Sequence, residues 1–154
     1  MRYIHKTTEN FLNKELGLDA TGYEQDWCLE LADDEKIDCY IKYYKTSDRN
    51  DDIDFALLSL ISASFDEKIQ GTGIFASSDI EYDDLFIHFD NDIVTIYGKE
   101  ILDHWKTIKK IALSNKDLFK QIVDYWSKND PDECSCASSL LYRDLLAEEF
   151  TNAK

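Results

Sequence analysis

The chain has 154 residues, of which 44% are hydrophobic and 13% aromatic, and its 17 Lys and Arg against 32 Asp and Glu give a formal net charge of −15. The hydrophobic content excludes a disordered acidic tail, and the length predicts one globular domain, residues 1–154, able to bury a sizeable core. The charge argues against a surface that binds DNA or an anionic membrane directly.

The first ten residues lack the apolar segment of a signal peptide, and the uncharged run at residues 55–65 is far shorter than a membrane span of roughly 20 residues. We therefore expect a soluble, cytoplasmic protein with no membrane partner, in which the cysteines are reduced thiols. Cys28 and Cys39 lie among apolar residues, which indicates core packing. Cys134 and Cys136 lack the Cys-x2-Cys spacing of structural zinc sites, so a role for them beyond packing stays open, and we expect no metal and no cofactor.

The first third of the chain gives one short helix and two ambiguous segments. Thr7 or Thr8 can cap a helix that ends at Gly17. Residues 27–31 favour a strand. Residues 37–44 carry apolar side chains at alternate positions and also at helical spacing, so the pattern leaves both strand and helix open.

Residues 51–70 give the strongest signal in the sequence. The segment opens on carboxylates that can cap a helix, has no charged residue from Phe55 to Phe65, and stops at Gly71. A helix that is apolar on nearly all sides must be buried on nearly all sides. We therefore predict a central buried helix at about residues 51–70, around which the other elements pack.

The region after this helix has the composition of β-structure. Residues 85–89 and 93–97 are rich in β-branched and aromatic side chains, and residues 90–92, Asp-Asn-Asp, have good hairpin-turn chemistry. Helical spacing then returns in three segments, at residues 101–114, at residues 116–126 and from about residue 135 to 150. The sequence thus predicts one α+β domain in which three to four or more helices pack on a small antiparallel sheet.

The charge is unevenly distributed along the chain. Residues 1–50 contribute −4, residues 51–104 contribute −11 from 2 basic and 13 acidic side chains, and residues 105–154 are neutral with 8 of each. Six acids lie between Asp79 and Asp92 with no Lys or Arg among them. We expect these carboxylates to form a strongly negative surface.

No motif in the chain predicts catalysis. Gly71-Thr-Gly73 is too short for a dinucleotide or phosphate loop, and residues 90–92 are not followed by the glycine and glutamate of a calcium loop. The three histidines lack metal-binding spacing, and His88 is better explained as an edge residue whose proton affinity is raised by neighbouring carboxylates. We therefore expect a protein that is not an enzyme and has no catalytic residues.

An acidic protein of this kind is suited to presenting carboxylates to a basic protein partner. Opposite charge accelerates encounter, and aromatic side chains ringed by polar groups commonly supply the affinity. Tyr82, Phe86 and Tyr97 are the candidate aromatic anchors. The predicted partner-binding residues are Asp79, Glu81, Tyr82, Asp83, Asp84, Phe86, His88, Asp90, Asp92 and Tyr97.

Two stretches of sequence also resemble a known group of proteins. One is the apolar helix from Phe55 to Asp66, and the other is Trp105-x2-Ile108 followed by Asn115-x2-Leu118-x3-Ile122-x2-Tyr125-Trp126. In both, the chain is similar to the small acidic immunity proteins of bacterial toxin–immunity pairs, including those of contact-dependent growth inhibition. The resemblance implies a cytoplasmic inhibitor that binds one cognate toxin, often a nuclease, and blocks its active site, but it assigns no functional residue.

Two other functions remain open. The chain could be a DNA mimic that inhibits a nucleic-acid-binding protein, provided that its fold aligns the acids at a spacing close to that of DNA, which has one charge per roughly 1.7 Å of axis. It could also be a metal-dependent hydrolase that uses Asp or Glu together with His88. The sequence leaves the oligomeric state undetermined.

Overall fold

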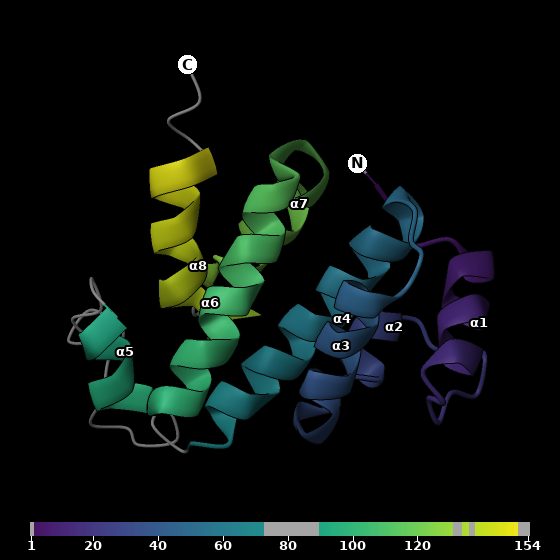
Figure 1. The fold of residues 1–154 in the computed structure, drawn as a ribbon, viewed down its shortest axis with the longest axis horizontal. Helices are drawn as coiled ribbons and strands as arrows, with labels where there is room; N and C mark the ends of the chain where they lie inside the picture. The colour runs from purple at the N-terminus through teal and green to yellow at the C-terminus, as the bar shows by residue number, and fades with distance from the viewer. Residues whose placement is uncertain (1, 73–89, 131–133, 136–137, 151–154) are drawn as a thin grey trace. The chain divides into compact units, whose positions relative to one another are not determined.

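The structure is a computed structural model that describes residues 2–72, 90–130, 134–135 and 138–150. It divides into two compact units, Met1–Ser64 and Phe65–Lys154, and helix α4, Asp51–Gln70, contributes to both. In Figure 1 the first unit is coloured from purple to blue and the second from teal to yellow. Each unit buries apolar side chains of its own.

The described part of the first unit is helical. Its elements are α1 (Lys6–Glu15), α2 (Trp27–Glu30), a 3-10 turn (Asp34–Lys36), α3 (Ile37–Thr46) and the first part of α4. Residues 37–44, which the sequence left open, belong to α3. They are helical because Ile37, Tyr40 and Ile41 share one face of a helix, and all three are buried there.

Helix α4 confirms the strongest prediction of the sequence. It spans Asp51–Gln70, and residues 55–66 are all buried. Its N-terminal cap is the side chain of Asn50, which accepts a hydrogen bond from the backbone N–H of Ile53 at 2.9 Å. The predicted carboxylate caps instead fill the first turn, where the helix dipole favours negative charge.

The predicted strand at residues 27–31 is the single helical turn α2. The carboxylate of Glu30 accepts a hydrogen bond from the backbone N–H of Asp26 at 2.8 Å, which satisfies a donor at the start of the turn. The indole of Trp27, 3% exposed, donates to the side chain of Asn13 at 2.7 Å. This side-chain contact buries Trp27 against α1 without any strand pairing.

The second unit is also built from helices. It contains the end of α4, then α5 (Asp90–Tyr97), α6 (Lys99–Ser114), α7 (Lys116–Trp126) and α8 (Ser139–Leu145), which continues as a π-helical segment (Leu146–Phe150). Helix α7 packs against both α6 and α8. Trp105 stacks on Phe65 with ring centroids 5.9 Å apart and meets Tyr142 edge-on at 4.9 Å, so aromatic rings join three of these helices.

The predicted hairpin around residues 90–92 is also replaced by a helix. These residues form the first turn of α5, and Ile93 and Tyr97 are buried while Thr95, which a strand would place on the same face, is exposed. That burial follows the four-residue spacing of a helix and not the alternation of a strand. The other half of the predicted hairpin, residues 85–89, lies outside the described residues.

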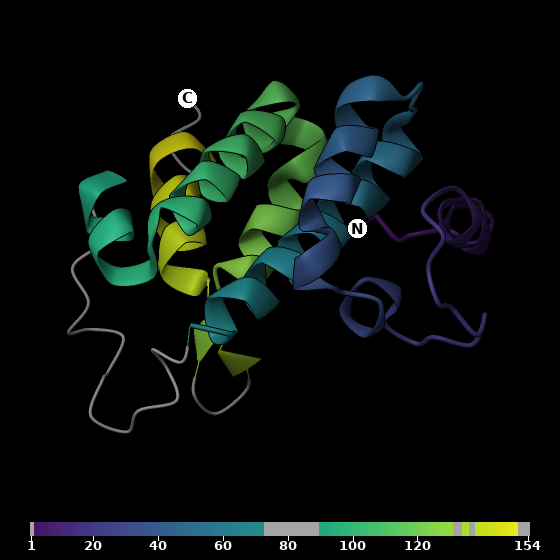
Figure 2. The ribbon, with the colours of Figure 1, turned by 60° about the horizontal axis from the view of Figure 1, so that its bottom comes forward.

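The strands in the described part of the chain are only two residues long. Asn129–Asp130 (β1) pairs antiparallel with Cys134–Ser135 (β2), in the register Asn129 with Ser135 and Asp130 with Cys134. Figure 2 shows this ribbon as two short arrows. A pairing of this size cannot carry a layer of helices, so the α+β prediction is wrong, and the described residues form a helical protein.

A buried polar contact ties the end of α4 to the start of α8. The Asp66 side chain, 5% exposed, accepts hydrogen bonds from the Ser138 backbone N–H at 2.8 Å, the Ser138 hydroxyl at 2.7 Å and the Gln70 amide at 2.8 Å. Ser138 is the residue before α8, so the carboxylate caps the positive end of that helix. The contact joins positions 72 residues apart in the sequence.

Candidate protein-binding surface

Seven of the ten predicted partner-binding residues lie outside the described residues, so the structure leaves that part of the prediction untested. They are Asp79, Glu81, Tyr82, Asp83, Asp84, Phe86 and His88. The remaining three, Asp90, Asp92 and Tyr97, all belong to α5.

On helix α5 these three residues do not form a simple exposed acidic patch. The carboxylate of Asp90 is exposed and lies 3.6 Å from the ammonium of Lys106, so part of its charge is matched. Asp92 is half-buried. The ring of Tyr97 is only 8% exposed and contributes to the core of the second unit, which the sequence reasoning did not anticipate for an aromatic anchor.

A second acidic stretch lies in the first unit, at residues 15–35, and we call it the acidic segment. It holds eight acids and no Lys or Arg. These acids are Glu15, Asp19, Glu24, Asp26, Glu30, Asp33, Asp34 and Glu35. The sequence reasoning missed it because a charge count over residues 1–50 includes seven basic residues that all lie outside it. Counting over windows free of Lys and Arg would have found it.

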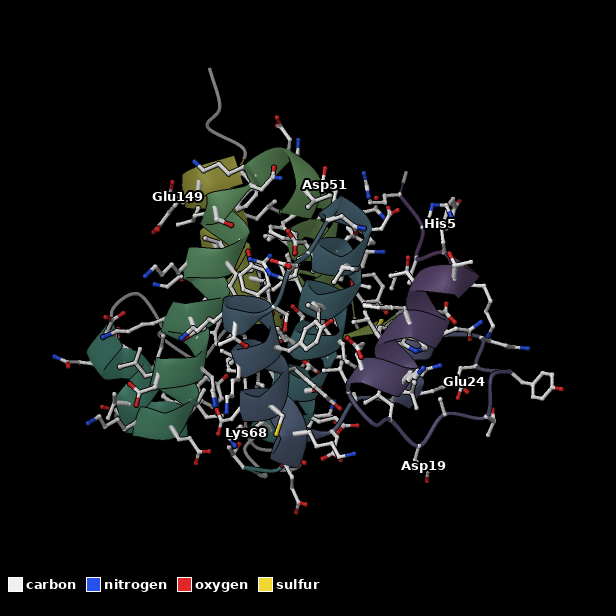
Figure 3. All side chains as sticks on the ribbon, turned by 45° about the vertical axis from the view of Figure 1, so that its right-hand side comes forward. His5, Asp19, Glu24, Asp51, Lys68 and Glu149 are labelled. Carbon is white, nitrogen blue, oxygen red and sulfur yellow. The ribbon has the colours of Figure 1, made fainter. Side chains whose placement is uncertain are left out.

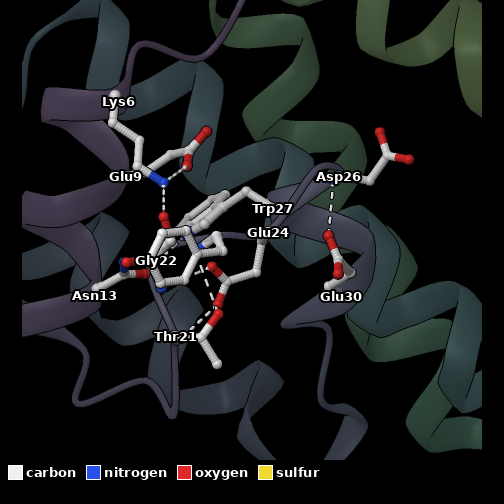
Figure 4. A network of polar contacts seen from close by, with 10 residues as sticks. Lys6, Glu9, Asn13, Thr21, Gly22, Glu24, Asp26, Trp27 and Glu30 are labelled. Atoms are coloured by element: carbon white, nitrogen blue, oxygen red, sulfur yellow. Dashed lines mark hydrogen bonds and ion pairs between the residues drawn. The ribbon is translucent and has the colours of Figure 1, made fainter.

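The tip of the acidic segment is a tight, hydrogen-bonded loop, shown in Figure 4. The carboxylate of Glu24 accepts hydrogen bonds from the backbone N–H groups of Thr21 at 2.7 Å and Gly22 at 3.0 Å. Gly22 has a φ of 88°, in the left-handed region where glycine is favoured. The ammonium of Lys6 on α1 donates to the Gly22 carbonyl at 2.5 Å, which holds the loop against the helix.

The loop favours the charged form of Glu24. Desolvation raises the pKa of this carboxyl, but backbone hydrogen bonds from Glu24 itself, Thr21 and Gly22 outweigh desolvation and lower its pKa overall. Glu24 is therefore ionised at neutral pH. Figure 3 shows its side chain, together with that of Asp19, along the segment that follows α1.

Tyr23 at the tip of this loop is the most exposed large apolar side chain of the described residues, at 90%. Its backbone N–H donates to the hydroxyl of Thr21 at 3.2 Å, so the backbone is fixed while the ring extends into solvent. Leu29, 40% exposed, is a second apolar side chain within the acidic segment. A solvent-exposed tyrosine on a hydrogen-bonded loop among carboxylates is the kind of side chain on which protein interfaces concentrate their binding energy.

The negative charge of the acidic segment is not neutralised by its own structure. None of its eight carboxylates forms an ion pair with a Lys or Arg in the part of the chain that the structure describes. Asp19, Asp26 and Glu30 are exposed. The charge is therefore available to a partner and is screened only by salt.

The described residues contain neither a cluster of metal ligands nor a membrane-spanning helix. No three His, Cys, Asp or Glu side chains there are grouped as the ligands of a metal ion would be. No helix there combines the length and the hydropathy needed to cross a bilayer. His104 is buried in α6, and His5 precedes the first turn of α1.

Comparison with known proteins gives no match, since no family model, no curated protein and no solved structure is significantly similar to this chain. The interpretation of the acidic segment therefore depends on its charge, its exposure and its hydrogen bonding.

Proposed function

We propose that the chain is a non-catalytic binding protein that neutralises a basic protein partner, and that it is an immunity protein that blocks a cognate bacterial toxin in the cytoplasm. The observation that carries the proposal is the acidic segment, with its ordered loop and the 90% exposed ring of Tyr23. The proposal also includes the acids at residues 79–92, of which Asp90 and Asp92 lie on α5 and the other four lie outside the described residues.

The charge of the chain supports fast recognition of a basic partner. A net charge of −15 attracts a cation-rich surface over several Ångströms and can raise association rates from about 10⁵–10⁶ M⁻¹s⁻¹ towards 10⁸–10⁹ M⁻¹s⁻¹ at low salt. A toxin that acts on nucleic acid would carry such a surface, because its substrate is a polyanion. An acidic inhibitor that covers this surface would exclude the substrate by occupying its place.

The loop at the tip of the acidic segment supports affinity. Side chains that must be ordered on binding cost roughly 0.5–1.5 kcal/mol each, and a backbone that is already fixed by Glu24 and Lys6 avoids much of the loop-ordering cost. Aromatic hot spots lose about 2 kcal/mol or more of binding free energy when truncated to alanine. We expect Tyr23 to be such an anchor.

The test is capture of the partner from lysate of the native host on immobilised protein, followed by purification of the captured protein and titration against variants. Tyr23→Ala combined with Asp26→Lys should weaken binding of the captured basic protein by at least about 30-fold, which corresponds to about 2 kcal/mol. Both side chains are exposed, and Asp26 makes no side-chain cap, so the fold should persist.

The matched control is Asp124→Lys, which makes the same charge reversal on an exposed position of α7. It should change affinity by no more than its contribution to long-range attraction. If no basic protein is captured, or if the captured protein binds the double variant and the control equally well, the acidic segment is not the binding surface.

A separate measurement distinguishes the hydrolase alternative. A metal site built on carboxylates and His88 would stabilise the folded protein when Mg²⁺, Mn²⁺ or Zn²⁺ is added, by mass action. For a non-catalytic binding protein we expect the melting temperature to rise no more than it does with a monovalent salt of equal ionic strength.

A further inference from the structure

A groove runs along the second unit between α6 and the C-terminal helix, which comprises α8 and its π-helical continuation. Its volume is about 630 Å³. Helix α7 packs against both α6 and α8, and the groove is lined by residues of α5, α6 and the C-terminal helix. Figures 1 and 2 both show α8 beside α6.

The two walls of this groove, which we call the charged groove, carry opposite charges. The α6 wall presents three ammonium groups, and the C-terminal helix presents three carboxylates, over a floor of Trp105, Leu141 and Leu145. The charged residues are Lys106, Lys109 and Lys110 on one wall and Asp144, Glu148 and Glu149 on the other. Asp90 and Ile93 of α5 close one end.

Two contacts fix the register between the walls. The ring of Trp105 on α6 meets the ring of Tyr142 on α8 at 4.9 Å. The ammonium of Lys116, the first residue of α7 and two residues beyond the end of α6, lies 3.3 Å from the carboxylate of Glu149. Counted from the ring contact at about 1.5 Å per helical residue, Lys110 lies about 7.5 Å along α6 and Glu148 about 9 Å along the C-terminal helix, so the two residues are at nearly the same level. The same contacts show that the two helices run in the same direction.

The exposed middle of each wall has charge to offer to another molecule. Lys110 and Glu148 are both exposed, and neither forms an ion pair with the described residues. Leu113, 37% exposed, adds apolar surface on the α6 wall. The groove therefore fits a surface whose charges are also divided into two parallel rows of opposite sign.

We propose that this partner surface is the charged groove of a second copy of the chain. Consider two copies that face each other across a two-fold axis parallel to the length of the groove. The axis leaves the level of each residue along the groove unchanged but exchanges the left and right walls. The Lys wall of each copy therefore faces the carboxylate wall of the other. The surface is then complementary to itself, as a two-fold symmetric interface must be. Lys110 of each copy faces Glu148 of the other, so the pair occurs twice.

The net charge predicts how this self-association depends on salt. Two copies carrying −15 each repel one another at long range, and salt with a Debye length of about 10 Å at 0.1 M screens that repulsion more than it screens ion pairs in contact. Self-association should therefore strengthen between about 10 mM and 150 mM salt. Binding of a basic partner through the acidic segment should weaken over the same range, so the two activities are distinguishable.

The experiment is sedimentation equilibrium of the full chain over about 10 µM to 1 mM protein, the range in which weak, transient interfaces populate their complexes. The wild type should form dimers. Lys110→Glu and Glu148→Lys should each weaken the dimer at least about 10-fold, because each places two like-charged pairs across the axis. The double variant, and an equimolar mixture of the two single variants, should restore dimers.

The matched controls are Lys120→Glu and Asp124→Lys, which make the same charge changes at exposed positions of α7, outside the groove. They should leave the dimer unchanged. A wild type that stays monomeric at 1 mM and 150 mM salt would overturn the proposal, as would single variants that dimerise as the wild type does. Rescue by the double variant without rescue by the mixture would indicate pairing across the groove within one chain, and would also overturn it.

Discussion

Replacement of Asp66 by alanine should be among the most destabilising single changes in the second unit. The carboxylate is 5% exposed and accepts three hydrogen bonds at 2.7–2.8 Å, two of them from Ser138, which is fully buried. Removing it leaves the Ser138 N–H and hydroxyl without this acceptor. An unsatisfied buried polar group costs roughly 1–3 kcal/mol, so we expect a loss of about 3 kcal/mol in the free energy of unfolding.

Two related substitutions show how much of this loss in unfolding free energy comes from each partner of the contact. Asp66→Asn keeps the shape and one acceptor oxygen facing Ser138, and should lose about 1 kcal/mol. Ser138→Ala removes one donor and leaves the backbone N–H in place, and should also lose about 1 kcal/mol. Gln70→Ala is the matched control: its amide is exposed and can turn to water, so it should change stability by less than about 0.5 kcal/mol.

The assay is equilibrium unfolding in urea, followed by circular dichroism and by tryptophan fluorescence. Two of the three tryptophans, Trp105 and Trp126, belong to the second unit and report on it. With an m-value of about 2 kcal/mol per M, the expected loss moves the midpoint by about 1.5 M for Asp66→Ala. A midpoint within about 0.25 M of the wild type would refute the reasoning, since an m-value of this size converts that shift to about 0.5 kcal/mol.

Three further outcomes follow from the charge and the thiols. The free protein should gain thermal stability as salt rises from about 10 mM to 150 mM, because repulsion among its carboxylates is screened; a melting temperature that falls over this range would contradict the charge argument. Asp83→Lys with Asp84→Lys should leave the circular dichroism spectrum unchanged and weaken partner binding, and unchanged affinity in a titration would remove residues 79–92 from the interface. Burial raises the pKa of the Cys28 thiol to about 11, so in a variant carrying Cys134→Ser and Cys136→Ser the exposed Cys39 should react with a disulfide reagent at pH 8 well before Cys28 does. Equal rates for the two thiols would show that Cys28 is accessible in solution.

Part of the site could be found from composition and part could not. The absence of Lys and Arg from residues 15–35 is visible in the sequence, although averaging over a longer window conceals it. The exposure of Tyr23 is a different matter, because an aromatic residue near Trp27 is equally compatible with the core. Only the hydrogen bonds of Glu24 and Lys6 place the ring in solvent.

Some of the helices could likewise be predicted from the sequence, and others could not. Helix α4 follows from the sequence alone, because an uncharged run from Phe55 to Phe65, between acidic residues that favour a helix start and a glycine that favours its end, predicts a helix buried on nearly all sides. Helices α6 and α7 likewise follow from long apolar spacing. The short segments at α2 and α5 do not. The sequence favours a strand at residues 27–31 and, through β-branched and aromatic side chains, at residues 93–97, whereas both segments are helical.

Tertiary packing determined that α2 and α5 are helical, because burial outweighs local conformational preference. Helix propensities of ordinary residues differ by up to about 0.7 kcal/mol, and β propensities span about 1 kcal/mol, whereas burying one large apolar side chain is worth roughly 1.5–3 kcal/mol. The burial of Trp27 beside Asn13, and of Ile93 with Tyr97 on one side of α5, therefore outweighs the local preference for a strand. The joining of Asp66 to Ser138 across 72 residues was likewise determined by packing, since no local pattern brings those two positions together.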